Sequence, residues 1–177
     1  ALDFKAMPYP ARIAEAQRLM RAAGYGPANP LRLTYMTTTN PDSKRLATVF
    51  QAMARIVYVD LRIQAVEAQV ELRNLRQHQF QLGAASWLAD FNDASNFLDL
   101  LRSDSGNNYA GYKNPKFDAA LDAAQAEPDQ KRRGRMLQAA ETLALSDLPW
   151  LVTRFPAQSE IVQPYVKGYV QNVRDCN

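Results

Sequence analysis

The first 85 residues switch between helical and strand spacing of their apolar side chains. Residues 10–23 repeat apolar side chains every three to four positions, which predicts a helix, and residues 31–36 alternate apolar with polar side chains, which predicts a strand. Residues 42–58 return to helical spacing, and residues 59–65 return to the period of two. This order predicts a strand–helix–strand unit, which in nearly all proteins is a right-handed crossover between two parallel strands.

Local signals mark the ends of these elements. Gly24 follows the last apolar position of the first helix, and a glycine there is typical of a helix end. Asn40 stands directly before Pro41. Asn is a strong helix N-cap and Pro is tolerated in a first turn, so this pair predicts the start of the second helix.

A third strand is predicted over residues 80–85, an apolar run that follows a short predicted helix at 70–77. Three parallel strands would open their carboxyl ends onto the loops 37–40, 67–69 and 87–93. Ligands of open α/β sheets bind at this edge. These three loops are therefore candidate ligand-binding loops.

The remainder predicts a long loop, two amphipathic helices and a last strand. The helices are expected over residues 115–126, with Asn114 as N-cap, and over residues 129–146. Residues 149–155 have strand character. Strands and helices that alternate in this way give α/β as the expected fold class.

The long loop before residue 115 holds the side chains with the most chemical content. It combines large aromatic rings with two acids. They are Trp87, Phe91, Tyr109 and Tyr112 among the aromatic residues, and Asp90 and Asp93 among the acids. Flat apolar surface beside a few polar groups is typical of a pocket for a small molecule or a peptide.

Composition narrows the class of protein. The chain has 177 residues, of which 47% are apolar and 22% charged, and this predicts one globular domain with a sizeable core. No stretch reaches the roughly 18 consecutive apolar residues of a membrane span. The N-terminal sequence has neither an initiator Met nor the pattern of a signal peptide, so we expect a processed protein or a piece of a longer one.

The low net charge and the scarcity of Cys and His argue against nucleic-acid binding, internal disulfides and zinc sites. The net charge is only +3, and the basic run at 131–135 is predicted to be a solvated helix face rather than a nucleic-acid site. A single cysteine, Cys176, excludes a disulfide within the chain. With a single histidine, His78, it also leaves no Cys/His set for zinc. We expect neither a metal nor a cofactor.

Seven short motifs occur in a fixed order over most of the chain. They are residues 14–25 with a final Ala-Gly-Tyr, 31–35, 59–63, 86–93 with the pattern Trp-x-x-Asp-Phe-x-Asp, 108–118 with the pattern Asn-x-x-x-Tyr-x-Asn-Pro-x-Phe-Asp, 147–150 and 166–169. Each motif alone is weak, but together and in this order they are specific. With them the chain resembles the C-terminal lobe of the bacterial oligopeptide- and dipeptide-binding proteins of ABC importers, solute-binding family 5.

The resemblance implies a lobe like those of the type II periplasmic binding proteins, with a mixed sheet and helices on both faces. Residues 1–177 would form a single α/β lobe of a larger, two-lobed protein that closes on its ligand. The implied role is non-catalytic: binding of peptides in the periplasm, or outside the membrane on a lipid anchor, and delivery to the ABC transporter permease. The implied partners are the peptide and that permease, without nucleic acid, and the isolated lobe could self-associate.

The resemblance also implies a set of ligand-binding residues. Asp90 stands where peptide-binding members have the acid that pairs with the α-amino group of the ligand, and backbone groups at Trp87 and Leu88 would hydrogen-bond the peptide as an added strand. An ammonium that leaves water must meet a carboxylate, because an unpaired charge is costly to bury. The remaining members of the predicted set are Ser86, Ala89, Phe91 and Tyr109.

Other roles stay open for these side chains. Asp90 could cap the loop by accepting backbone N–H bonds, and Trp87 could be core instead of pocket wall. Asp93 is expected to be structural, as the N-cap of a helix. Tyr109 is expected to pack beneath the loop, with Asn108 bonding to the backbone there.

Two positions depart from the family pattern. Tyr58 stands where many members have Gly in the turn before a strand. Residues 84–85 are both Ala and offer no basic side chain before the Trp, so this segment has no partner for the carboxylate at the end of a peptide.

Other functions remain as alternatives. The cargo could be an oligosaccharide or a nickel chelate, since members of this family also carry such solutes. A glycosidase would use Asp90 and Asp93 as paired carboxylates, but three residues apart in a loop is not a diagnostic spacing. One His and one terminal Cys do not build a nucleophilic triad.

Overall fold

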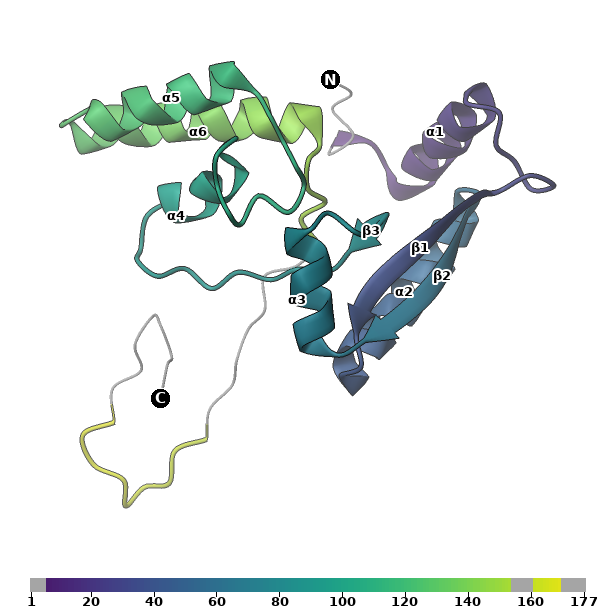
Figure 1. Ribbon diagram of the computed structural model, residues 1–177, viewed down its shortest axis with the longest axis horizontal. Helices are drawn as coiled ribbons and strands as arrows, with labels where there is room; N and C mark the ends of the chain where they lie inside the picture. Colours follow the sequence, from purple (N-terminus) through teal and green to yellow (C-terminus); the bar gives the residue numbers. More distant parts are fainter. Residues whose placement is uncertain (1–5, 154–160, 170–177) are drawn as a thin grey trace. The chain divides into compact units, whose positions relative to one another are not determined.

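The structure is a computed structural model that describes residues 6–153 and 161–169 (Figure 1). The chain divides into two compact units, Ala1–Ala85 and Ser86–Asn177. The first unit carries the sheet, and the described part of the second unit is helical. The prediction of a single lobe over residues 1–177 stays a prediction.

The sheet of the first unit has three strands in the order β2-β1-β3. Strand β1 (Leu31–Thr38) pairs in parallel with β2 (Val59–Val66) over eight residues, from Leu31 opposite Val59 to Thr38 opposite Val66. On its other side β1 pairs in parallel with β3 (Leu82–Gly83). The predicted crossover between parallel strands is confirmed, and within the described residues the sheet is parallel, not mixed.

Helices cover both faces of this sheet. The ring of Tyr35 in β1 lies 6.0 Å from the ring of Phe50 in α2 (Pro41–Ile56). The next residue, Met36, receives a hydrogen bond at its sulfur from Asn74 in α3 (Ala68–Arg76), at 3.6 Å. Successive side chains of a strand point to opposite faces. Helices α2 and α3 therefore lie on opposite faces, as predicted.

Helix α1 (Tyr9–Ala22) packs beside the end of α2. The side-chain amide of Gln17 donates to the backbone carbonyl of Ile56 at 2.8 Å. Arg21 lies over the ring of Tyr58, 5.2 Å from its centre, and also donates to the Tyr58 hydroxyl. Tyr58 has a φ of 64°, the left-handed region that favours Gly. Here the contact with Arg21 holds the larger residue in place.

Strand β3 is shorter than predicted: the expectation of a strand over residues 80–85 is wrong outside Leu82–Gly83. The reason lies in the side chain of Gln81, whose Oε1 accepts the backbone N–H of Thr34 at 2.7 Å. This side chain takes the place that a strand carbonyl would occupy. At Gly83 a Cβ would lie 2.9 Å from Leu75 Cδ2, so glycine permits the close approach of α3.

The second unit packs short and long helices around one apolar cluster. Helix α4 (Ser95–Leu98) continues into the 3₁₀ helix η2 (Asp99–Leu101), and α5 (Pro115–Ala126) is followed by α6 (Gln130–Asp147). Their inward side chains form the core. Its buried members are Leu98, Leu101, Phe117, Leu121, Ala124, Leu137, Ala140 and Ala144. Figure 1 shows α5 and α6 side by side, as their three-residue connection requires.

The predicted helix caps are present in both units. Asn40 Oδ1 accepts the N–H of Asp42 at 2.8 Å, and Asn114 Oδ1 accepts the N–H of Lys116 at 3.0 Å. The predicted strand at 149–155 is wrong over Pro149–Thr153, which has no strand pairing, and its last two residues lie outside the described residues. Trp150 instead packs against the core of the second unit. Cys176 also lies outside the described residues.

Candidate ligand-binding loop

Asn96 organises the segment that carries Asp90. This residue is buried in α4, with 7% of its surface exposed. Its Oδ1 accepts the indole N–H of Trp87 at 2.8 Å and the backbone N–H of Asp90 at 3.2 Å. Its Nδ2 donates to Asp90 Oδ2 at 3.4 Å. One buried amide therefore brings together the two side chains on which the sequence prediction rests most.

The surface of this segment is apolar with one carboxylate. Asp90 is exposed, and Leu88 and Phe91 are exposed by 62% and 48%. Trp87 is exposed by 37%, so its ring forms surface although its N–H points inward. An exposed carboxylate beside apolar side chains can pair with a cation while the apolar groups of the same ligand leave water.

The other residues of the predicted ligand-binding set differ in their exposure. Ser86 is exposed and Ala89 is half-buried, at the ends of the Trp87–Leu88 pair. Tyr109 is half-buried, and its hydroxyl donates to Asn107 Oδ1 at 3.3 Å. Nothing in these contacts tests a ligand role, so the whole set stays a prediction. Among the described residues, the Asp90 carboxylate accepts a hydrogen bond from the side chain of Asn96 and none from a loop N–H, so the predicted alternative of loop capping by this carboxylate is not seen there.

Asn108 holds the second half of the loop, as predicted. It is 6% exposed, its Nδ2 donates to the carbonyls of Arg102 and Tyr112 at 3.1 and 2.7 Å, and its Oδ1 accepts the N–H of Tyr112 at 3.0 Å. These three bonds close the turn that carries Tyr109. The turn packs on the core through Tyr112, whose ring meets that of Phe117 edge-on at 5.6 Å.

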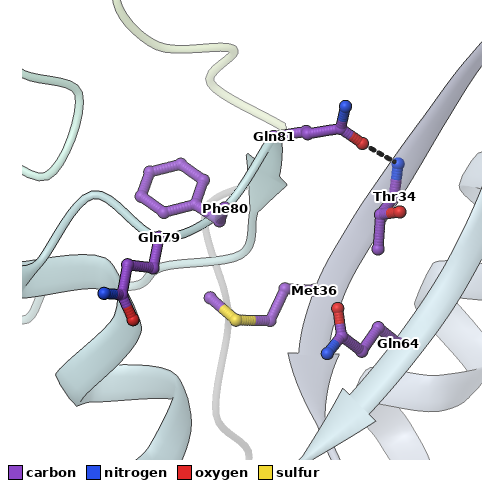
Figure 2. A pocket seen from close by; sticks show the side chains of 6 residues that line it. All are labelled: Thr34, Met36, Gln64, Gln79, Phe80 and Gln81. Atoms are coloured by element: carbon purple, nitrogen blue, oxygen red, sulfur yellow. Dashed lines mark hydrogen bonds between the residues drawn. The ribbon is translucent and has the colours of Figure 1, made fainter.

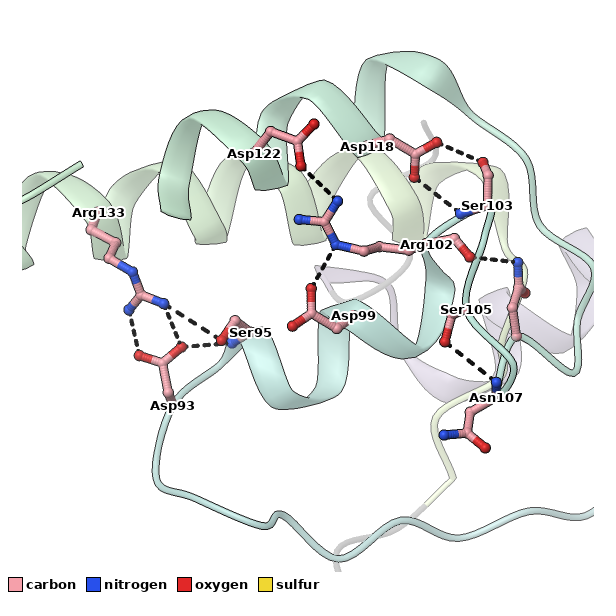
Figure 3. Close-up of polar contacts among 11 residues, drawn as sticks. Asp93, Ser95, Asp99, Arg102, Ser103, Ser105, Asn107, Asp118, Asp122 and Arg133 are labelled. Carbon is pink, nitrogen blue, oxygen red and sulfur yellow. Dashed lines mark hydrogen bonds and ion pairs between the residues drawn. The ribbon is translucent and has the colours of Figure 1, made fainter. Parts of the chain in front are cut away.

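An ion pair ties the other end of the segment to α6. The guanidinium of Arg133 binds both carboxylate oxygens of Asp93, with Nη2 2.9 Å from Oδ1, and the same oxygen accepts the N–H of Ser95 at 2.9 Å (Figure 3). Asp93 thus has a structural role, as predicted, but the N-cap of α4 is Ala94 and not Asp93, so the predicted N-cap role is wrong. Arg133 belongs to the basic run that was predicted to be solvated, but its side chain is only 18% exposed. For Arg133 that prediction is wrong.

The hydrogen bonds from Arg133 hold the pKa of Asp93 well below its ordinary value near 3.8. The unfolded chain therefore binds a proton at higher pH than the folded chain, and the stability contributed by Asp93 is present above pH 3.8 and is lost as the pH falls below it. We expect Arg133→Gln to lower the urea midpoint at pH 7 and to reduce the further loss between pH 4 and pH 2, as measured by circular dichroism.

The matched control for this prediction is Arg135→Gln, which removes the same charge from an exposed position of the same helix. The control should keep the acid dependence of the parent chain. An Arg133→Gln chain whose stability falls with acid as steeply as that of the control would contradict a stabilising pair.

The first unit contains a separate polar cavity of about 370 Å³. It lies beside the face of β1 that carries Met36, and its lining includes three glutamine side chains (Figure 2). The lining residues are Thr34, Met36, Gln64, Gln79, Phe80 and Gln81. None of the predicted ligand-binding residues belongs to this cavity.

No group of three or more His, Cys, Asp or Glu side chains in residues 6–153 and 161–169 is placed to hold a metal ion. Within the same residues, no helix combines the length and apolar character needed to cross a membrane.

Comparisons with known proteins extend these observations. The periplasmic murein peptide-binding protein MppA of Escherichia coli (strain K12) is 31% identical over 160 residues, which cover 90% of this chain and 30% of MppA. The probable deoxycholate-binding periplasmic protein YgiS of the same strain is 29% identical over 163 residues, covering 92% of this chain and 30% of YgiS. The chain thus spans about 30% of the length of these relatives.

Solved structures agree with the fold. Haemophilus influenzae OppA in complex with the peptide RPPGFSPFR matches with a TM-score of 0.79 and 29% identity, over 82% of this chain and 29% of OppA. This likeness confirms the predicted fold class. Residues 2–109, more than half of the chain, match the family described as bacterial extracellular solute-binding proteins, family 5 Middle. The chain therefore belongs to family 5 of the bacterial extracellular solute-binding proteins.

Proposed function

We propose that this chain is part of the solute-binding component of an ABC importer and that it binds peptides through the segment around Asp90. The observation that carries the proposal is the exposed carboxylate of Asp90, oriented by a buried amide and flanked by exposed apolar side chains. Support comes from relatives named as peptide-binding proteins and from the relative whose structure holds the peptide RPPGFSPFR.

The chemistry of a peptide fits this surface. Every unmodified peptide carries an α-ammonium group, and a carboxylate gives it a charge-assisted hydrogen bond. Backbone N–H and C=O groups of an extended segment such as 86–89 can pair with those of any peptide, whatever its sequence. The exposed rings and Leu88 would then contact the first side chains of the ligand. Recognition of this kind is tolerant of sequence and needs no catalysis.

The proposal includes a location and a partner. The protein would act in the periplasm or on a lipid anchor outside the membrane, and its loaded form would meet the membrane permease of the importer. We further propose that residues 1–177 form one lobe of a two-lobed protein, since the relatives are about three times as long. A peptide between two lobes would receive contacts from both.

Mass spectrometry of the ligand that copurifies with the complete gene product tests the proposal. After denaturation, peptides of mixed sequence are expected, because recognition by the ammonium and the backbone does not select side chains. A single non-peptide solute released in their place would leave the solute-binding role intact and overturn the peptide assignment.

One observation favours a second cargo class. The exposed apolar side chains of the segment could pack against a sterol-like ring system, and one relative is named for probable deoxycholate binding. A bile acid has a carboxylate and no ammonium, so its hydroxyl groups could donate to Asp90 but it would form no ion pair there. Copurified peptides and copurified steroids are distinguished directly by mass.

A further inference from the structure

The side-chain amide of Asn96 has a single orientation that satisfies its neighbours. Its oxygen faces two donors, the indole N–H of Trp87 and the backbone N–H of Asp90. A flipped amide would place its NH₂ group against both donors. The oxygen must therefore face them, and the nitrogen then points at the carboxylate of Asp90, as the distance of 3.4 Å to Oδ2 records.

This arrangement fixes Asp90 at two points. Asn96 holds both the backbone N–H and one carboxylate oxygen of the same residue, so rotation of the Asp90 side chain is restricted. Within residues 6–153 and 161–169, no hydrogen bond reaches the second carboxylate oxygen, Oδ1. Because Asn96 is 7% exposed and its backbone N–H is bound to the carbonyl of Asp93 at 3.1 Å, the amide itself sits on a rigid support.

We propose that Asn96 is a positioning residue, which holds the Asp90 carboxylate and the Trp87 ring in the arrangement that receives the α-ammonium group of the ligand. The proposal rests on the peptide-binding function proposed above. It goes beyond that function because it assigns the orientation of the site to a buried residue that touches no ligand. Ser at this position would be too short to make all three bonds, and Leu would make none.

Two variants distinguish the acceptor role of the Asn96 side chain from its donor role. Asn96→Leu keeps the approximate volume and removes both the acceptor and the donor. Asn96→Asp keeps the acceptor for Trp87 and for the Asp90 N–H, but places a carboxylate against the Asp90 carboxylate. Two like charges so close raise the pKa of one of them, so the pair gains a proton as the pH falls.

The first measurement is hydrogen exchange of the Trp87 indole N–H, by NMR on the complete gene product, with the signal identified by its loss in Trp87→Phe. Loss of a hydrogen bond is expected to accelerate this exchange by about tenfold in Asn96→Leu. Asn96→Asp should keep the slow exchange. Unchanged exchange in Asn96→Leu would overturn the proposal.

The second measurement is the affinity for tri-alanine and for its N-acetylated form. Asn96→Leu should lower the affinity for the free-amine peptide by about tenfold and leave the acetylated peptide unaffected. In Asn96→Asp the affinity for tri-alanine should fall as the pH is lowered from 7 to 5, whereas the parent protein stays constant. A merely structural Asn96 would shift both peptides equally and would add no pH dependence, which would overturn the proposal.

Different results would contradict the peptide-binding function and the positioning role of Asn96. If the parent protein binds neither form of tri-alanine, the peptide-binding function is contradicted at the ammonium site, while the exchange of the Trp87 proton still decides whether Asn96 holds the segment. If Asn96→Leu fails to fold, Asn96→Asp supplies both readouts. In that case fast indole exchange or a flat pH profile would overturn the positioning role.

Discussion

Replacing Asp90 by Asn in the complete gene product is expected to lower the affinity for a peptide with a free α-amino group by roughly a hundredfold. The change keeps the size of the side chain and its place beside Asn96 but removes its negative charge. An ammonium group that has left water then faces a neutral amide, and removing one partner of a desolvated charge pair costs about 2 to 5 kcal/mol. Isothermal titration with tri-alanine measures the loss.

The ligand supplies the best control for this prediction. N-acetylated tri-alanine has no ammonium group, so its affinity should be the same in the parent protein and in Asp90→Asn. A second control is Asp104→Asn, which makes the same chemical change at an exposed position outside the segment and should bind like the parent. Equal losses for the free and the acetylated peptide would remove Asp90 from the amine site.

The parts of the fold predicted from sequence are those set by neighbours in the chain. Asn40 and Asn114 each precede a Pro, and in the structure each caps the helix that follows. Phe117 and Leu121 recur at helical spacing, and both are buried. Such signals act over a few residues, so they can be recognised without knowing the fold.

The parts that could not be predicted depend on residues far apart in the sequence. Gln81 shortens β3 by binding the N–H of Thr34, 47 positions earlier, and no local pattern reports this contact. Arg133 pairs with Asp93 across 40 positions and was interpreted as part of a solvated run. One feature of the sequence could have indicated that Asn96 is buried. It lies four positions before the apolar residue Leu100, which places both on one face of a helix, and both are buried.

The candidate site also has a part that the sequence predicted and a part that it could not. The resemblance to a family placed Asp90 and Trp87 in one segment, because a family motif records residues that act together. The motif does not show how the segment is held. The hydrogen bonds of Asn96 supply that information: the indole N–H of Trp87 binds Asn96, and among the described residues only one oxygen of the Asp90 carboxylate has a hydrogen-bond partner.

Replacing Phe117 by Ala is expected to destabilise the second unit by about 3 to 5 kcal/mol. Phe117, a residue of α5, is 0% exposed and belongs to the buried core that also contains Leu101 and residues of α6. Truncation loses the burial of the ring and its edge-on contact with Tyr112, and it leaves a cavity that the surrounding helices fill only in part. Because Tyr112 ends the turn held by Asn108, the loss should reach the loop as well.

Urea unfolding followed by circular dichroism measures this loss, with Phe97→Ala as the matched control. Phe97 lies in the same unit but is 43% exposed, so the same truncation should cost less than about 1 kcal/mol. A small shift for Phe117→Ala, equal to that of the control, would contradict the packing of the core. A large shift for Phe117→Ala alone would support a core that also stabilises the loop. Asn96, which orients Asp90, belongs to α4, and α4 packs on this core through Leu98.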